Sequence, residues 1–299
     1  DAVSPDNPVL LTDISYHSVW ANSQALRLAG VDRRTPDPAG GVIERDARGE
    51  PTGVLRESAA ALVRAVVPPP GSLQNKEALR WALDTMLGQG ITSFTDALVD
   101  EDALQAYADL AESGQLKQRV RACQLWRRSD RDVNDAAAEF AARRNLWARS
   151  RFEPDCVKIA LDGVPTDSHT AAMIEPYVDD AHGESRTRGM LMVPTATLNA
   201  AVTAFDAAGL VVKMHAAGDG AVRAGLDAIA AARAANGNSG LRHDIAHNSF
   251  VDPADLQRAR GLFATFEMSP YIWYPNPIIP DVLKAVGPER LLHWTPVKG

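Results

Sequence analysis

Three residues are candidates for metal binding, and each of them lies in or at the end of an apolar, strand-like run. Lys158 interrupts such a run, where an uncompensated ammonium group would be costly to bury. His215 and His247 each end one. A single histidine is more often a hydrogen-bonded core residue than a ligand, but imidazole is the commonest metal-binding side chain. The repetition of histidine at two successive run ends therefore favours a metal site.

A lysine at a strand end is also compatible with a different chemistry. A desolvated amine can attack a carbonyl group and form a Schiff base. Lys158 could therefore serve a Schiff-base lyase instead of a metal-dependent hydrolase. The residues alone leave both alternatives open.

Six short β-rich runs would position these side chains. We expect strands over 91–95, 120–125, 156–161, 210–215, 243–247 and 262–266. Apolar residues at helical spacing separate the runs, for example over 74–88. The spacing of the strand ends is close to the roughly 31 residues per βα unit of a complete barrel, and one longer loop precedes His215.

This alternation predicts parallel βα units, arranged as a barrel or as an open doubly wound sheet. No Gly-x-Gly-x-x-Gly motif follows the first strand, which disfavours a dinucleotide-binding sheet. We therefore expect an α/β fold of the (β/α)8 TIM barrel type, with active-site residues at the carboxyl ends of its strands. The segment 1–70 is rich in Pro, Gly, Asp and Arg, so we expect an irregular insertion or lid there and the barrel over 71–299.

Composition excludes several classes of partner. The chain has 299 residues, 45% of them hydrophobic, which is enough for a large core. A net charge of −7 without basic runs disfavours nucleic acid and anionic membrane surfaces as partners. No uninterrupted apolar run approaches the roughly 18 residues of a membrane span. Cys123 and Cys156 are the only cysteines, and we expect buried, reduced thiols, as in a cytoplasmic protein.

Several ordered blocks of the sequence resemble the amidohydrolase-3 (YtcJ-like) family. The blocks extend over nearly the whole chain. They are 11–23 with Ala25-Leu26, 40–46 with 49–53, Val157-Lys158 with Asp162-Gly163, His-Ala-Ala-Gly-Asp at 215–219, and Arg-His-Asp-Ile-Ala-His at 242–247. One departure is Ala246, where family members usually have glutamate.

The resemblance implies a metal-dependent hydrolase that cleaves a C–N bond of the amide or formamide type in a small molecule. In that family two divalent metals, such as zinc, lie in the barrel mouth and are bridged by a carboxylated lysine. By resemblance the metal-binding and catalytic residues are Lys158, His215 and His247. Imidazole nitrogens and carboxylate oxygens suit Zn²⁺ and similar ions, which activate water for attack on a carbonyl.

Five further residues are candidates for supporting roles. His17, Trp20 and Asn22 could form a substrate-binding lid, or they could simply pack a capping loop. Asp162 and Asp219 could hydrogen-bond the ligands from behind, or they could form turns.

Two ligand sets of the family are missing from the 299 residues. Family members carry a His-x-His pair on the first barrel strand and an aspartate on the eighth, and this sequence contains no His-x-His. We therefore expect a fragment with barrel strands two to seven, inactive alone, with an empty or weakly occupied metal site and an unmodified Lys158. The alternative is a degenerate, non-catalytic binding protein. Exposed edges of an incomplete barrel would be covered by a second copy, as a homo-oligomer, or by the segment 1–70.

Overall fold

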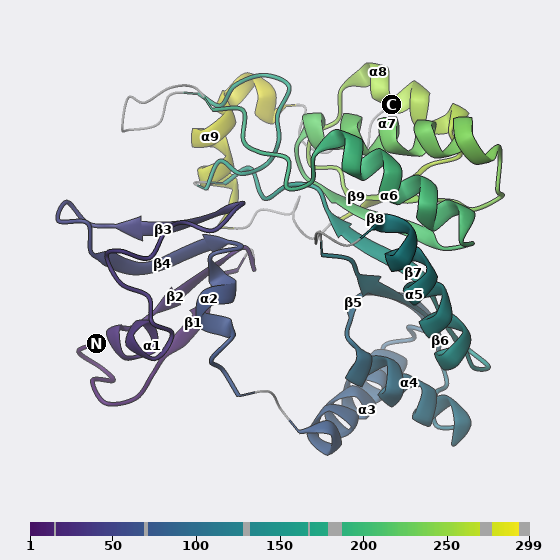
Figure 1. Ribbon diagram of the computed structural model, residues 1–299, viewed down its shortest axis with the longest axis horizontal. Helices are drawn as coiled ribbons and strands as arrows, with labels where there is room; N and C mark the ends of the chain where they lie inside the picture. Colours follow the sequence, from purple (N-terminus) through teal and green to yellow (C-terminus); the bar gives the residue numbers. More distant parts are fainter. Residues whose placement is uncertain are drawn as a thin grey trace. The chain divides into compact units, whose positions relative to one another are not determined.

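The computed structural model describes residues 1–14, 16–68, 71–127, 132–166, 168–178, 187–269 and 277–292 (Figure 1). The chain divides into two compact units. The first comprises Asp1–Pro69 with Ser168–Thr170, and the second comprises Pro70–Asp167 with Ala171–Gly299. No described helix combines the length and the apolar character that crossing a bilayer requires.

The first unit contains a four-stranded antiparallel sheet with the strand order β1-β2-β4-β3. Its elements are β1 (Leu10–Thr12), β2 (Ser18–Ala21), α1 (Ser23–Leu28), β3 (Gly41–Arg45), β4 (Pro51–Glu57) and α2 (Ala60–Arg64). One sheet face packs Val19, Ile43 and Leu55 against residues of both helices. The expectation of irregular structure over 1–70 is therefore wrong. The strands are so short that the Pro and Gly of the turns between them dominate the composition.

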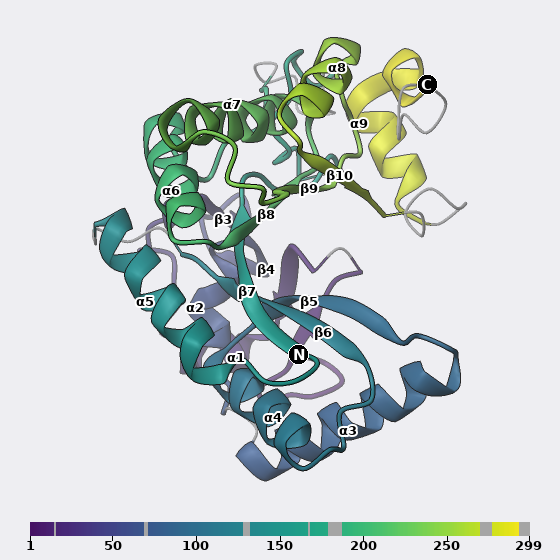
Figure 2. The same cartoon turned by 90° about the vertical axis from the view of Figure 1, so that its right-hand side faces the viewer.

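The second unit contains a parallel six-stranded sheet with the strand order β10-β9-β8-β7-β6-β5. Its strands are β5 (Ser93–Val99), β6 (Arg119–Leu125), β7 (Phe152–Ala160), β8 (Val211–Ala216), β9 (Asp244–His247) and β10 (Thr265–Met268). Its helices are α3 (Ser72–Gly88), α4 (Glu101–Glu112), α5 (Val133–Trp147), α6 (Thr195–Ala207), α7 (Asp219–Asn236), α8 (Pro253–Gly261) and α9 (Ile279–Leu291). The sheet curls as a half-barrel (Figure 2). All six predicted strands are present, and their parallel arrangement confirms the βα interpretation.

The two faces of this sheet have different chemistry. Val157, Ile159, Val212, Met214 and Ile245 belong to the core cluster that packs against α5, α6 and α7. Because successive side chains of a strand point to opposite faces, Lys158, Lys213, His215 and Asp244 lie on the other face. The alternation thus separates an apolar helix-facing surface from a charged inner surface.

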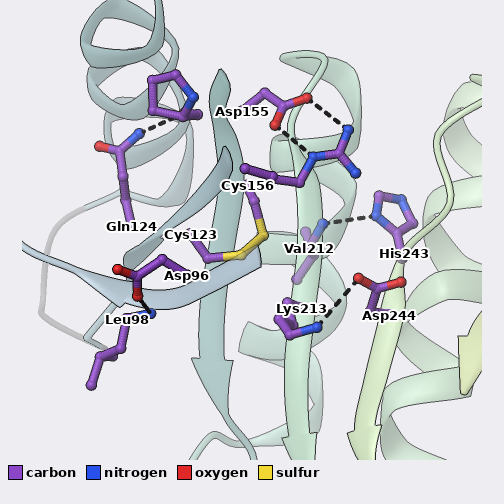
Figure 3. The surroundings of a disulfide bond; sticks show 12 residues. Asp96, Leu98, Cys123, Gln124, Asp155, Cys156, Val212, Lys213, His243 and Asp244 are labelled. Carbon is purple, nitrogen blue, oxygen red and sulfur yellow. Dashed lines mark hydrogen bonds and ion pairs between the residues drawn. A yellow bond between two sulfur atoms is a disulfide. The ribbon is translucent and has the colours of Figure 1, made fainter. Parts of the chain in front are cut away.

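Cys123 and Cys156 form a disulfide between β6 and β7 (Figure 3). The prediction of two reduced thiols is wrong, because the parallel register places the two cysteines directly opposite each other, with their Cα atoms 4.2 Å apart. Spacing along the sequence does not reveal this register. A cytoplasmic location stays a prediction, now without support from reduced thiols.

A buried network joins α6, α7 and β9 on the helix-facing side. His243 accepts a hydrogen bond from Val212 N at 3.0 Å through Nδ1 and donates from Nε2 to Asp206 at 2.9 Å. Arg233, Asn236 and Ser239 complete the bonding of the Asp206 carboxylate. Burial lowers the pKa of His243 below its ordinary 6.5, although the neighbouring carboxylate opposes this. The network therefore holds a neutral imidazole.

The disulfide generates the first prediction. It closes a loop with a sequence separation of 33, so the double variant Cys123→Ala/Cys156→Ala should lose about 3–4 kcal/mol of unfolding free energy by loop-closure entropy. Urea denaturation of oxidised wild type and the variant measures the difference. Reduced wild type is the control and should resemble the variant. Equal stability of all three would contradict the predicted role of the crosslink.

The second prediction concerns pH. The folded state keeps His243 neutral, whereas the unfolded chain takes up a proton as pH falls below 6.5. Unfolding free energy should therefore decrease from pH 6.5 downward until the folded pKa is passed. His243→Gln should be less stable than wild type at about pH 7.5, but its unfolding free energy should fall less between about pH 7 and about pH 5. Parallel slopes for wild type and variant in urea denaturation would exclude this linkage.

Candidate metal-binding site

His215 is the last but one residue of β8, a strand in which all residues are buried. Its Nε2 lies 2.9 Å from the carbonyl oxygen of Gly163. A carbonyl oxygen only accepts, so Nε2 carries the proton and donates. In the neutral imidazole Nδ1 is then the nitrogen with a lone pair, and it is the atom that would bind a metal ion.

His247 ends β9, and its ring centroid lies 4.6 Å from that of His215. Its Nδ1 lies 2.9 Å from Ser269 Oγ. Metal binding through Nε2 would leave Nδ1 protonated and donating to this hydroxyl, the usual arrangement of a ligand imidazole with an outer partner. Ser269 was not predicted from the sequence, because its partner His247 is 22 residues away.

Lys158 lies on β7, on the same sheet face as His215. Burial lowers its pKa to about 8, and the neighbouring Lys213 cation adds to the effect, while Glu267 and Asp244 oppose it. The amine is thus neutral in a larger fraction of molecules than an exposed lysine would be.

Lys213 is a second buried lysine of this face, and it was not singled out from the sequence. It is opposite Lys158 in the register of β7 and β8, and it forms ion pairs with Glu267 and, at 3.6 Å, with Asp244. Burial raises the pKa of Asp244, which the Lys213 cation partly offsets. The sequence pattern could have identified Lys213, since this lysine interrupts an apolar run as Lys158 does. Its acidic partners on two other strands were not predictable.

Asp162 lies beside His215 and is completely buried. Its carboxylate accepts hydrogen bonds from the backbone N–H groups of Ala172, Ala217 and Gly218 at 2.9–3.0 Å. One carboxylate oxygen is also 3.6 Å from His215 Nε2. The three backbone bonds show a turn-forming role for Asp162, and its role behind a metal ligand stays a prediction.

Asp219 shapes the turn after β8. Its carboxylate accepts from the backbone N–H groups of Ile174 at 2.7 Å and Gly220 at 2.9 Å. Burial raises its pKa, and these two hydrogen bonds oppose the rise. Gly218 is required because a Cβ there would be 2.1 Å from the carbonyl oxygen of Ala172. The small residues of this turn thus accommodate the loop that follows β7.

His17, Trp20 and Asn22 belong to the first unit. His17 Nδ1 donates to Glu57 Oε2 at 2.8 Å, and Glu57 Oε1 accepts from Thr170 Oγ1 at 2.7 Å. The Trp20 side chain is 61% exposed on the open sheet face. A substrate-binding role for these two residues stays a prediction.

Asn22 has a local structural role. Its Oδ1 accepts from Val9 N and from Ala25 N, which caps α1, and its Nδ2 donates to Ser4 O and Asn7 O. With its amide group engaged in this way, capping explains the residue without a substrate.

The described donors fit a divalent ion in part. Two imidazoles have one nitrogen each held by a protein partner, and Lys158 shares their sheet face. Among the described residues no group of three His, Cys, Asp or Glu side chains is arranged to hold a metal ion. Lys158 stays the predicted third ligand on this sheet face, and a lysine binds metals only when neutral or carboxylated.

The bonding of Asp162 generates the third prediction. Asp162→Asn places an amide N–H₂ against buried backbone N–H donors, so unfolding free energy should fall by about 2–4 kcal/mol. Asp227→Asn is the matched control: Asp227 is a half-exposed α7 residue paired with Arg258, and its loss should cost less than about 1 kcal/mol. Urea denaturation of both variants decides. Equal losses would show that the three backbone bonds do not anchor the loops.

Comparison with known proteins shows the family of the chain. The family model described as "Amidohydrolase family" matches residues 1–299. The putative amidohydrolase YtcJ of Bacillus subtilis is 31% identical over 97% of this chain and 52% of its own length. An N-substituted formamide deformylase of Arthrobacter pascens is 37% identical over 120 residues, which are 39% of this chain and 22% of that protein. The chain spans about half the length of curated relatives that match 97% of it.

A solved structure shows the same fold. The crystal structure of an uncharacterized metal-dependent hydrolase from Pyrococcus horikoshii has a TM-score of 0.67 and 24% identity, and the match covers 97% of this chain and 54% of that one. Since the family model extends over all 299 residues, the chain belongs to the amidohydrolase family.

Proposed function

We propose that this chain is part of a metal-dependent hydrolase that cleaves a C–N bond, of the amide or formamide type, in a small molecule. The observation that carries the proposal is the pair of imidazoles at adjacent strand ends, 4.6 Å apart, with one nitrogen of each held by the protein. Such a pair is typical of ligands whose orientation is fixed before the metal binds.

His215 Nδ1 and His247 Nε2 would hold the divalent ion. We propose zinc, because nitrogen and carboxylate oxygen donors suit it. When bound, the ion would supply a water nucleophile near neutral pH and polarise the carbonyl group of the substrate. Gly163 and Ser269 orient the imidazoles, and Asp162 holds the turn that follows β8 against the loop that follows β7.

Lys158 would provide an anionic oxygen ligand after carboxylation. The ammonium group first loses one proton, and the neutral amine then attacks carbon dioxide. A C–N bond forms while one C=O π bond gives its electrons to oxygen, and the nitrogen loses a second proton, so that the cation becomes a carbamate anion. The lowered pKa of Lys158, about 8, supports this step because only the neutral amine reacts. The nearby Lys213 cation would stabilise the resulting negative charge.

The substrate class rests on the relatives. A formamide deformylase among them supports an N-substituted formamide or amide. We propose that His17, oriented by Glu57, and Trp20 contact this substrate, while Asn22 serves the fold. We also propose that the chain associates into a homo-oligomer. We propose no nucleic-acid or membrane partner.

A Schiff-base lyase is the second candidate, because a pKa of about 8 would also suit Lys158 as a nucleophile. Borohydride reduction in the presence of a carbonyl substrate distinguishes the two. A hydrolase with a carboxylated or metal-bound lysine gives no adduct, whereas a lyase acquires a stable covalent modification on Lys158.

The fourth prediction concerns metal content. The purified 299-residue chain should bind at most one Zn²⁺, weakly enough to be lost on dialysis, and Lys158 should be unmodified, because the His-x-His and the aspartate of the family are absent from these residues. We also expect no formamide hydrolysis by the chain alone. Metal analysis before and after dialysis, mass spectrometry of Lys158 and a formamide hydrolysis assay measure these properties.

Histidine variants show where the chain binds any Zn²⁺. His215→Ala and His247→Ala should each abolish residual Zn²⁺ binding, whereas His243→Gln, a change of the other histidine near β9, should retain it in folded protein. Two ions per chain that survive dialysis would show that our ligand assignment is wrong. Binding that persists in both alanine variants would place the metal elsewhere.

A further inference from the structure

The last residue of β9 and the residue that follows it both have left-handed backbone. The φ angle is 78° at His247 and 50° at Asn248. Asparagine tolerates this conformation, but histidine adopts it less readily, and two such residues in succession persist only where their surroundings hold them. Their position next to a proposed metal ligand makes the cause of this turn important.

The turn reverses the direction of the His247 side chain. Ile245 packs in the helix-facing core, so regular strand alternation would point His247 to that face too. His247 is also opposite Ala216, another core residue. Yet its ring lies 4.6 Å from His215, which is on the inner face. The left-handed turn therefore brings His247 to the site.

Asn248 holds the turn with its side chain. The residue is fully buried, and its Nδ2 donates to Ile245 O at 2.8 Å and to Glu267 O at 3.1 Å. The amide thus closes the turn onto β9 and joins it to β10. Its backbone N–H bonds Ala216 O at 3.0 Å, which keeps the turn against β8.

The acceptor atom of the same amide makes no hydrogen bond within the part of the chain that the structure describes, so the two donated bonds must offset its burial. Asn248 Oδ1 is buried and has no hydrogen-bond partner among the described residues. An unmade bond of this kind costs about 1–3 kcal/mol. A smaller residue would avoid that cost, so the two donated bonds are the physical reason for an asparagine here.

We infer that Asn248 is a positioning residue that directs His247 toward His215. It acts through the left-handed turn and through β10, because Glu267, whose carbonyl it binds, lies two residues before Ser269, the partner of His247 Nδ1. The inference rests on the proposed function only where it names a metal ion as the partner of His247.

Nuclear magnetic resonance of histidine-labelled protein tests the inference. Wild type should show a nuclear Overhauser effect between the rings of His215 and His247. Asn248→Gly permits the left-handed backbone but removes both donors, and Asn248→Asp keeps the shape but replaces the donors with acceptors. Both variants should lose the ring contact, and Zn²⁺ binding, followed by the imidazole resonances, should weaken about 10–100-fold.

Asn236→Ala is the matched control. The Asn236 amide also bridges two acceptors, Thr203 O and Asp206 Oδ2, both at 2.9 Å. Its loss should lower stability yet leave the ring contact and Zn²⁺ binding unchanged. If neither Asn248 variant folds, Ser269→Ala is measured instead. This variant should fold but lose the nuclear Overhauser effect between the two histidine rings.

The outcomes separate this inference from the proposed function. A ring contact that persists in a folded Asn248 variant, or in Ser269→Ala if that is the only folded variant, overturns the positioning role whatever the metal does. A ring contact that is present in wild type and lost in the variants supports the role even if wild type fails to bind Zn²⁺, and that failure would count against the metal site alone.

Discussion

The buried carboxylate of Asp162 is the interaction on which the arrangement of the site depends. It binds the backbone of Ala172 in the loop after β7 and of Ala217 and Gly218 in the turn after β8. Three hydrogen bonds to a charged acceptor compensate for removing the carboxylate from water. His215 lies two residues before Ala217 and donates to Gly163, the neighbour of Asp162. The direction of the imidazole thus follows from loops that one side chain holds together.

The inner face of the sheet combines two lysines and two carboxylates in a confined space. Buried charges are tolerated when they are paired, and Lys213 pairs with both Asp244 and Glu267. Lys158 lies on the next strand, where burial and the second cation lower its pKa. Burial and the Lys213 cation thus increase the fraction of Lys158 that is a neutral amine, which both proposed chemistries of that residue require.

The sequence predicted those features that depend on local periodicity. Six strands and the strand-end positions of Lys158, His215 and His247 follow from apolar runs alternating with helical spacing. Features that depend on register between distant strands were missed, namely the Cys123–Cys156 disulfide and the partners of Lys213. The turn at His247 was missed for another reason, since strand alternation alone would point its side chain to the helices. The sheet within 1–70 was missed because its strands have three to seven residues.

We expect His215 and His247 to bind one divalent ion through Nδ1 and Nε2, respectively. A crystal structure of the chain with Zn²⁺, with anomalous diffraction at the zinc edge, would locate the ion. We predict an anomalous peak about 2.0–2.1 Å from both of these nitrogens, with the bonds to Gly163 and Ser269 intact. Zinc bound away from this pair, or bound to Nε2 of His215 with its bond to Gly163 broken, would contradict the account.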